Sequence, residues 1–175
     1  LLHNVNIFEH SYIHAFIINQ WSKMNSRNLS KIAGLSYLVI FFAAIFANFF
    51  VIESILQAPI ETIQQDQMMV RFGILAFLIT VLFDVVVAWA LYELYKKHHL
   101  SVLSTFFRMM HAAIMGVAVF ALPATLTLTH ADEILRQLDI FNTIWLIGLF
   151  FFGVHLILLG KIIRNPHIIA FFLVL

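Results

Sequence analysis

The sequence contains no cysteine and few charged residues, and both shortages restrict what the protein can be. Without a thiol, the chain can form no disulfide, hold no metal through a thiolate and carry out no thiol catalysis. Only 11% of its 175 residues are charged, whereas soluble domains are about a quarter charged. The formal net charge of +1 argues against a nucleic-acid partner, which calls for a clustered basic face. Phosphate-loop, dinucleotide-binding, nucleophile-elbow and H-E-x-x-H zinc motifs are also missing from the chain.

The amino-acid composition is that of a protein surrounded by lipid. Hydrophobic residues make up 62% of the chain, phenylalanine alone occurs 19 times, and the mean hydropathy is +0.96. A helix that crosses a bilayer needs roughly 20 mostly apolar residues. Four stretches meet this requirement: 33–52, 70–95, 101–124 and 142–160. The sequence therefore predicts an all-α polytopic transmembrane helix bundle whose surroundings are membrane lipid.

The two ends of the chain look different from this bundle. Residues 1–23 lack the basic start and small-residue cleavage site of a signal peptide, and Met24 is a sensible initiator. We therefore expect 1–23 to be an extension, either not native or an interfacial helix, and 24–175 to form the transmembrane domain. A fifth apolar stretch begins at Ile168, but the eight residues that remain would rise only about 12 Å as a helix. We expect a C-terminally truncated chain.

Basic residues in the loops predict the orientation of the bundle. With the N-terminus inside, the cytoplasmic segments hold seven basic residues and the outer segments hold two. The seven are Lys23, Arg27, Lys31, Lys96, Lys97, Lys161 and Arg164, and the two are Arg71 and Arg136. This asymmetry predicts a multi-pass protein with a cytoplasmic N-terminus.

An outer loop, residues 129–141, has the pattern of a short amphipathic helix. Its apolar side chains recur at helical spacing at Ile134, Leu135, Leu138 and Phe141. Acidic residues lie in what would be its first turn, where they favour a helix. We expect this segment to be a separate short helix that caps the outer end of the bundle.

Small residues at four-residue spacing indicate where helix backbones could approach one another. Helix association in lipid depends on close packing and polar contacts, because lipid is as apolar as the side chains. The pairs with this spacing are Ala43 with Ala47 and Ala112 with Gly116, and further candidates for close approach on the fourth span are Gly153 and Gly160. These residues support a compact bundle without indicating a function.

Four ionisable residues lie inside the predicted spans: Asp84, Arg108, His111 and His155. A charge at mid-membrane costs roughly 2.5–3.5 kcal/mol on insertion scales, so such side chains normally face the bundle interior and pair. Counting about 1.5 Å per residue puts Asp84 and His111 within about 3 Å of the same depth. The same count puts Arg108 and His155 within about 2 Å of each other. We therefore predict a buried acid–imidazole–guanidinium cluster.

This buried cluster is open to several interpretations. It could be a structural clasp between helices, a proton or ion pathway, or a pocket for a small ligand. His111 and His155 could instead hold haem or a metal, but their depths differ by about 6 Å and no third ligand is evident. We therefore expect no cofactor and no metal.

The leading functional hypothesis is a small membrane module that binds or senses a small ligand or moves protons. The alternative is a membrane oxidoreductase or other enzyme that uses the intramembrane histidines. A homo-oligomer is compatible with either hypothesis.

Four blocks of sequence resemble a known family. They are KIAGLSYLVIFFAAIFANFF, DVVVAWALY, RMMHAAIMG and FFGVHLILLG. Over about residues 26–164, the order and spacing of these blocks resemble those in the bacterial multi-pass proteins of domain-of-unknown-function family 4386. The resemblance implies about six spans in a complete protein, a bacterial plasma-membrane location and no assigned activity. Positions that match the family pattern are Ala33, Gly34, Tyr37, Asp84, Trp89, Arg108, His111, Gly116, Gly153, His155 and Gly160. The pattern departs at KIIRNPHIIAFFLVL, where Pro166 follows Arg164 almost at once.

Overall fold

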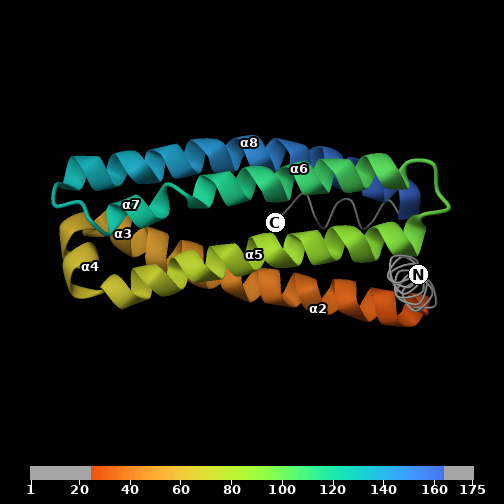
Figure 1. Ribbon diagram of the computed structural model, residues 1–175, viewed down its shortest axis with the longest axis horizontal. Coiled ribbons are helices and arrows are strands. Elements are labelled where there is room, and N and C mark those ends of the chain that lie inside the picture. Colours follow the sequence, from red (N-terminus) through yellow and green to blue (C-terminus); the bar gives the residue numbers. More distant parts are fainter. Residues whose placement is uncertain (1–24, 164–175) are drawn as a thin grey trace, which may run out of the picture.

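The structure, a computed structural model, describes residues 25–163 as long helices that lie side by side (Figure 1). Four helical stretches are long and apolar enough to cross a membrane: Ser26–Gln57, Gln67–Tyr95, Ser101–Thr125 and Ala131–Ile163. The described part of the chain contains no strand. The prediction of an all-α polytopic bundle is therefore confirmed, and the protein is a helical membrane protein.

The four spans contain shorter elements as well as regular α-helices. In chain order the elements are α2 (Ser26–Ile45), the π-helix η1 (Phe46–Ile52), α3 (Glu53–Gln57), α4 (Pro59–Gln65), α5 (Gln67–Tyr95), α6 (Ser101–Val119), α7 (Leu122–Thr125) and α8 (Ala131–Ile163). The Asn25 side chain caps α2 by accepting a hydrogen bond from the Arg27 amide. Prolines lie in the first turns of α4 and α7, where a missing amide hydrogen costs no helical bond.

The long helices pack in the order α2, α5, α6, α8. The most extensive contacts join α6 to α8, α2 to α5, and α5 to α6. Figure 1 shows α6 and α8 above and α5 and α2 below, with neighbouring helices running nearly antiparallel along the long axis. Helices α5 and α6 are therefore central, and side chains between them can reach both outer helices.

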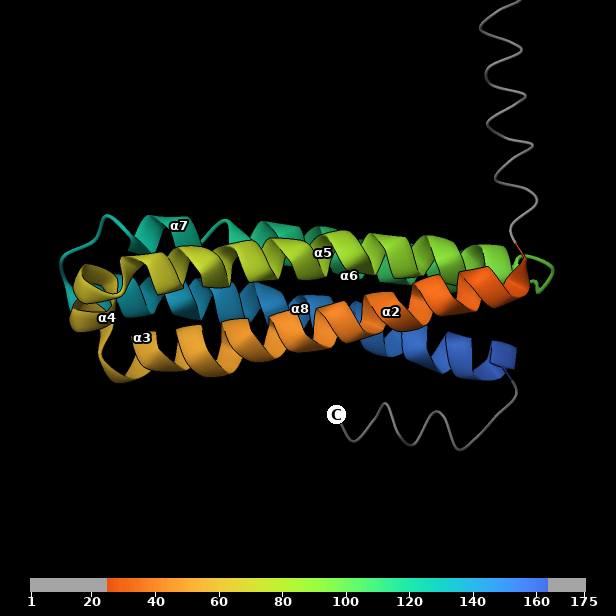
Figure 2. The same ribbon diagram turned by 90° about the horizontal axis from the view of Figure 1, so that it is seen from below.

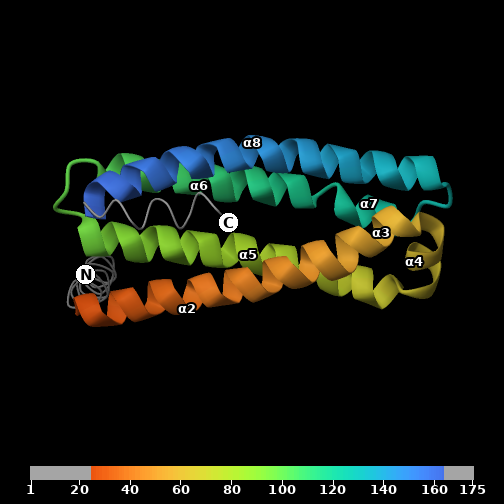
Figure 3. The same ribbon diagram turned by 180° about the vertical axis from the view of Figure 1, so that it is seen from behind.

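The two ends of the bundle differ in charge. One end, which we call the basic end, holds the start of α2, the loop at 96–100 and the end of α8; its basic residues are Arg27, Lys31, Lys96, Lys97 and Lys161. The opposite end holds α3, α4 and α7, as the view from behind also shows (Figure 3). Its described loops and helix starts carry the acids Glu53, Glu61, Asp66, Asp132, Glu133 and Asp139.

An apolar core fills the half of the bundle away from the basic end. Phe77 is fully buried and packs against Phe141 and Trp145, with ring centroids 5.0 and 5.3 Å away. Large apolar side chains also cover the outside of the helices; Phe49, Phe72 and Phe150 are examples. Such an exterior suits a lipid environment, because hydrocarbon does not penalise exposed apolar side chains.

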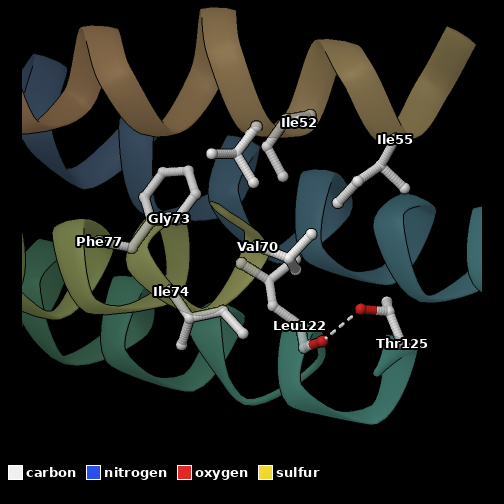
Figure 4. Close-up of a pocket in the computed structure, with 9 residues that line it drawn as sticks. Ile52, Ile55, Val70, Gly73, Ile74, Phe77, Leu122 and Thr125 are labelled. Atoms are coloured by element: carbon white, nitrogen blue, oxygen red, sulfur yellow. Dashed lines mark hydrogen bonds between the residues drawn. The ribbon is translucent and has the colours of Figure 1, made fainter. Parts of the chain in front are cut away.

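The π-helix η1 packs very closely against α5 near this core. A Cβ atom on Gly73 would lie 2.6 Å from Val51 Cγ1, closer than real Cβ atoms approach other atoms. Glycine is therefore required where η1 crosses α5. A small apolar cavity of about 10 Å³ lies at this crossing (Figure 4). The only hydroxyl in its lining, on Thr125, donates to the Leu122 carbonyl oxygen at 2.7 Å.

The structure corrects two expectations about local structure. Residues 129–141 do not form a separate capping helix, because from Ala131 onward they are the first turns of the continuous helix α8. The apolar stripe of that segment packs into the core instead, with Ile134, Leu138 and Phe141 buried. Gly153 makes no close helix contact, since a Cβ there would meet nothing within 4 Å.

Two expectations about the ends of the chain fall outside residues 25–163. These are the extension at 1–23 and the fifth span that begins at Ile168.

Candidate functional site: a buried Asp–Arg–His cluster

The four ionisable side chains singled out in the spans lie together between the helices. Asp84 is on α5, Arg108 and His111 are on α6, and His155 is on α8. Each is buried, with at most 5% of its surface exposed. Arg108 and His111 are three residues apart, so they project from the same face of α6 toward its neighbours. The cluster therefore links three helices from the centre of the bundle.

The Arg108 guanidinium is the centre of this cluster. Its Nη2 donates a short hydrogen bond to Asp84 Oδ1, and its Nε donates to the Asp84 carbonyl oxygen at 3.3 Å. Its Nη1 donates to Tyr37 Oη at 2.8 Å and contacts His155 Nε2 at 3.3 Å. One fork-shaped side chain thus contacts the three other long helices, which a lysine with a single ammonium could not match.

Two aromatic rings enclose the guanidinium. Its central carbon lies 5.0 Å from the centre of the Tyr37 ring and 5.3 Å from the centre of the Phe152 ring. Aromatic faces attract cations, and the attraction is stronger where water is excluded. The rings therefore stabilise the positive charge while shielding it from lipid.

The contacts of His155 determine which of its nitrogens carries the proton. A guanidinium has only donors, so Nε2 of His155 must be the acceptor of the Arg108 contact. Nδ1 then carries the hydrogen and donates to the Ser104 carbonyl oxygen at 2.9 Å, with Ser104 Oγ also 2.9 Å away. Both ring nitrogens are engaged. His155 is accordingly a neutral acceptor that helps to hold Arg108.

His111 is held differently, and one of its nitrogens faces the aspartate. Its Nδ1 lies 2.9 Å from the Gly148 carbonyl oxygen, which can only accept, so Nδ1 carries a hydrogen. Its Nε2 lies 3.6 Å from Asp84 Oδ2. A bare lone pair on Nε2 would repel an ionised carboxylate. The contact is attractive only when a proton resides on Nε2 or on Asp84.

No buried polar side-chain atom of residues 25–163 lacks a hydrogen-bond partner. This matters because an unpaired polar group in a low-dielectric interior is costly. Within the cluster, Asp84 Oδ1 is committed to Arg108 and Oδ2 faces His111.

The pattern of ionisable residues in the sequence did not predict four further residues that contact the cluster. Tyr37, Ser104, Gly148 and Phe152 all contact the cluster through an oxygen or a ring. Tyr37 had a signal, because it matches the family pattern close to the start of the first span. The Gly148 contact and one of the two Ser104 contacts use backbone carbonyls, which every residue has, so no side-chain pattern could reveal those two. The other Ser104 contact is made by its hydroxyl.

The histidines do not fit haem or metal ligation in this arrangement. Both nitrogens of His155 and Nδ1 of His111 are already engaged with protein atoms. The remaining nitrogen, Nε2 of His111, faces Asp84. Within residues 25–163, no group of three or more His, Asp or Glu side chains is arranged to hold a metal ion. The alternative of a redox centre on these histidines therefore has no free ligand set here.

Comparison with known proteins gives a family but no activity. The family model described as "Domain of unknown function (DUF4386)" matches residues 32–175, which includes the last three spans and all but the beginning of the first. The chain belongs to the DUF4386 family. The resemblance seen in the sequence is therefore confirmed, and the buried cluster lies inside the family's domain. No curated protein and no solved structure matches this DUF4386 chain.

Proposed function

We propose that the Asp84–His111 pair takes up and releases a single proton, and that this DUF4386 protein uses it to sense or relay protons within the membrane. The observation that carries the proposal is the contact between His111 Nε2 and Asp84 Oδ2 at 3.6 Å. Because Nδ1 of His111 is bonded to Gly148, that contact needs one proton on either atom. Buried carboxylates and imidazoles are the usual relay groups of membrane proteins.

The rest of the cluster supports a proton site more than a ligand pocket. Arg108 stays charged under all physiological conditions and holds Asp84 Oδ1. It therefore fixes the carboxylate without competing for the exchangeable proton. The four side chains are almost fully buried and bonded to one another, which leaves little room for a bound molecule.

A purely structural clasp is the main competitor, and it differs in what a mutation should do. Asp84→Asn keeps the size of the side chain but removes its ability to bind the exchangeable proton. Asp139→Asn, an exposed site on α8, makes the same chemical change away from the cluster and serves as the matched control. Both variants should be purified and reconstituted into vesicles with a pH-sensitive dye in the lumen.

A proton site predicts that Asp84→Asn loses the pH-dependent signal of the wild-type protein while its helical circular dichroism is retained. The signals to follow are lumenal acidification and intrinsic tryptophan fluorescence. If the cluster is only a structural clasp, Asp84→Asn should lower the stability of the fold and leave any pH response of the folded protein unchanged. His111→Gln should reproduce the loss of signal, because glutamine forms hydrogen bonds but does not titrate.

We also propose that the basic end faces the cytoplasm of a bacterium. Five basic residues of the described chain lie at that end, against Arg71 and Arg136 at the opposite end. Loops rich in Lys and Arg remain on the cytoplasmic side of bacterial membranes. This orientation would put the cluster in the cytoplasmic half of the bilayer or near its midplane, with Asp84 about 18 Å from Lys96 along α5 at 1.5 Å per residue.

A further inference from the structure

We infer that Gly148 is a positioning residue of the proton site. Because Gly148 has no side chain, α8 can present its carbonyl oxygen to Nδ1 of His111. Nε2 of His111 is then left to exchange the proton with Asp84. The inference rests on the proposed function of that pair. Neither family membership nor the pattern of ionisable residues points to Gly148.

The geometry shows how little room there is for a side chain at this position. Gly148 is buried in α8, and its carbonyl oxygen lies 2.9 Å from His111 Nδ1. A Cβ atom added to Gly148 would lie 3.4 Å from His111 Nδ1, Ile114 Cγ2 and Met115 Sδ. Three atoms of α6, one of them His111 Nδ1 itself, would therefore be in direct contact with the added methyl group, at the lower edge of normal contact distance.

The bond to Gly148 matters because a neutral imidazole carries only one hydrogen. If that hydrogen were on Nε2, His111 would be a fixed donor to Asp84 and would have no lone pair facing it. With the hydrogen on Nδ1, Nε2 has a lone pair directed at Asp84 Oδ2. The proton can then move from Nε2–H of the imidazolium to the carboxylate. The products are a neutral imidazole with Nδ1–H and a neutral carboxyl group, and no other bond changes.

The chain offers a matched control on the same helix. Gly153 is also in α8, but a Cβ there would meet nothing within 4 Å. Gly148→Ala and Gly153→Ala make the same change in intrinsic helix propensity. They differ in whether the added methyl group meets α6.

The test is nitrogen NMR of the full chain with ¹⁵N-labelled histidine, reconstituted in lipid and titrated with base. Neutral His111 is expected to carry its hydrogen on Nδ1 in the wild-type protein and in Gly153→Ala. In Gly148→Ala, the ratio of the Nδ1–H form to the Nε2–H form should fall about fivefold, the equivalent of one hydrogen bond of about 1 kcal/mol. His111→Gln identifies the resonance by removing it.

Two results would overturn the inference. One is a wild-type His111 whose neutral form carries its hydrogen on Nε2, and the other is a Gly148→Ala ratio equal to that of Gly153→Ala. If Gly148→Ala fails to fold, the wild-type tautomer decides alone. The proposed function fails separately, when neither Asp84 nor His111 titrates in the folded wild-type protein even though the Nδ1–H form is present.

Discussion

Replacing Arg108 by methionine tests the energetic role of the cluster, and we expect the bundle to lose about 3–5 kcal/mol of stability. Methionine replaces the unbranched aliphatic part of arginine and has high helix propensity, so the change removes the guanidinium group with its charge and its donors. The site is 1% exposed, so water cannot replace what is lost.

The magnitude follows from what Arg108 contacts. It makes four polar contacts, to the Asp84 carboxylate, the Asp84 carbonyl, Tyr37 and His155. At the average of about 0.6 kcal/mol measured inside membranes, these four account for about 2.4 kcal/mol. The Asp84 carboxylate would then be buried without a counter-charge, and an unsatisfied buried group adds about 1–3 kcal/mol. The cost of the unpaired carboxylate arises only in a charged network, so it distinguishes this cluster from ordinary interhelical hydrogen bonds.

The assay is reversible unfolding in mixed micelles of mild detergent and SDS, followed by tryptophan fluorescence and far-UV circular dichroism. Asp84→Asn and the Arg108→Met/Asp84→Asn pair complete a double-mutant cycle. We expect the pair to be less destabilised than the sum of the two single variants, because the double variant has no unpaired carboxylate. A loss below about 1 kcal/mol for Arg108→Met, or additive effects in the cycle, would refute this reasoning.

Three further predictions concern packing, the tyrosine contact and orientation. Gly73→Ala should destabilise the bundle by about 1–3 kcal/mol in the same unfolding assay, because its Cβ would lie 2.6 Å from Val51 Cγ1. Tyr37→Phe should cost about 0.5–1.5 kcal/mol, because it removes the acceptor of one arginine N–H but keeps the ring. The chain has no cysteine, so single cysteines at Lys97 and Glu61 can be labelled alone. In intact cells, an impermeant maleimide should label the second and spare the first.

Each of these predictions has its own control. Adding Val51→Ala to Gly73→Ala should recover part of the loss, and Gly116→Ala should be mild because its nearest neighbour is 3.8 Å away. Equal losses at both glycines would argue against the tight crossing. An unchanged stability for Tyr37→Phe would mean that its hydroxyl does not hold the guanidinium. Labelling of Lys97→Cys from outside would reverse the proposed orientation.

The sequence was sufficient to predict the fold class because a lipid environment restricts which backbone structures can form. A run of about 20 apolar residues in a membrane has few options other than a helix, since backbone groups must bond within the segment. The positions of the buried charges also followed from the helical rise. Depth counting grouped Asp84 with His111 and Arg108 with His155, and in the structure all four lie in one network.

The sequence was less informative where two helices meet through their backbones. Neither the carbonyl of Gly148 nor that of Ser104 could be expected to bond a histidine, because a carbonyl is present at every position. Gly153 and Gly148 look alike in sequence, yet only the second faces α6 closely. Likewise, the acidic segment that forms the first turns of α8 was predicted to be a separate helix, because its amphipathic pattern differs from the apolar run that follows. The helix continues from the amphipathic segment into the apolar run because neither proline nor glycine occurs between Ala131 and Ile147.

The most direct test of the account is infrared difference spectroscopy of the reconstituted protein during a pH titration, with Asp84→Asn as the reference. A protonated carboxyl group absorbs at a frequency separate from ionised carboxylates and from the backbone. The account predicts a single carboxyl band that appears and disappears with pH, is missing in Asp84→Asn and is altered in His111→Gln. A spectrum with no Asp84 carboxyl band at any pH at which the fold persists would contradict the proton site.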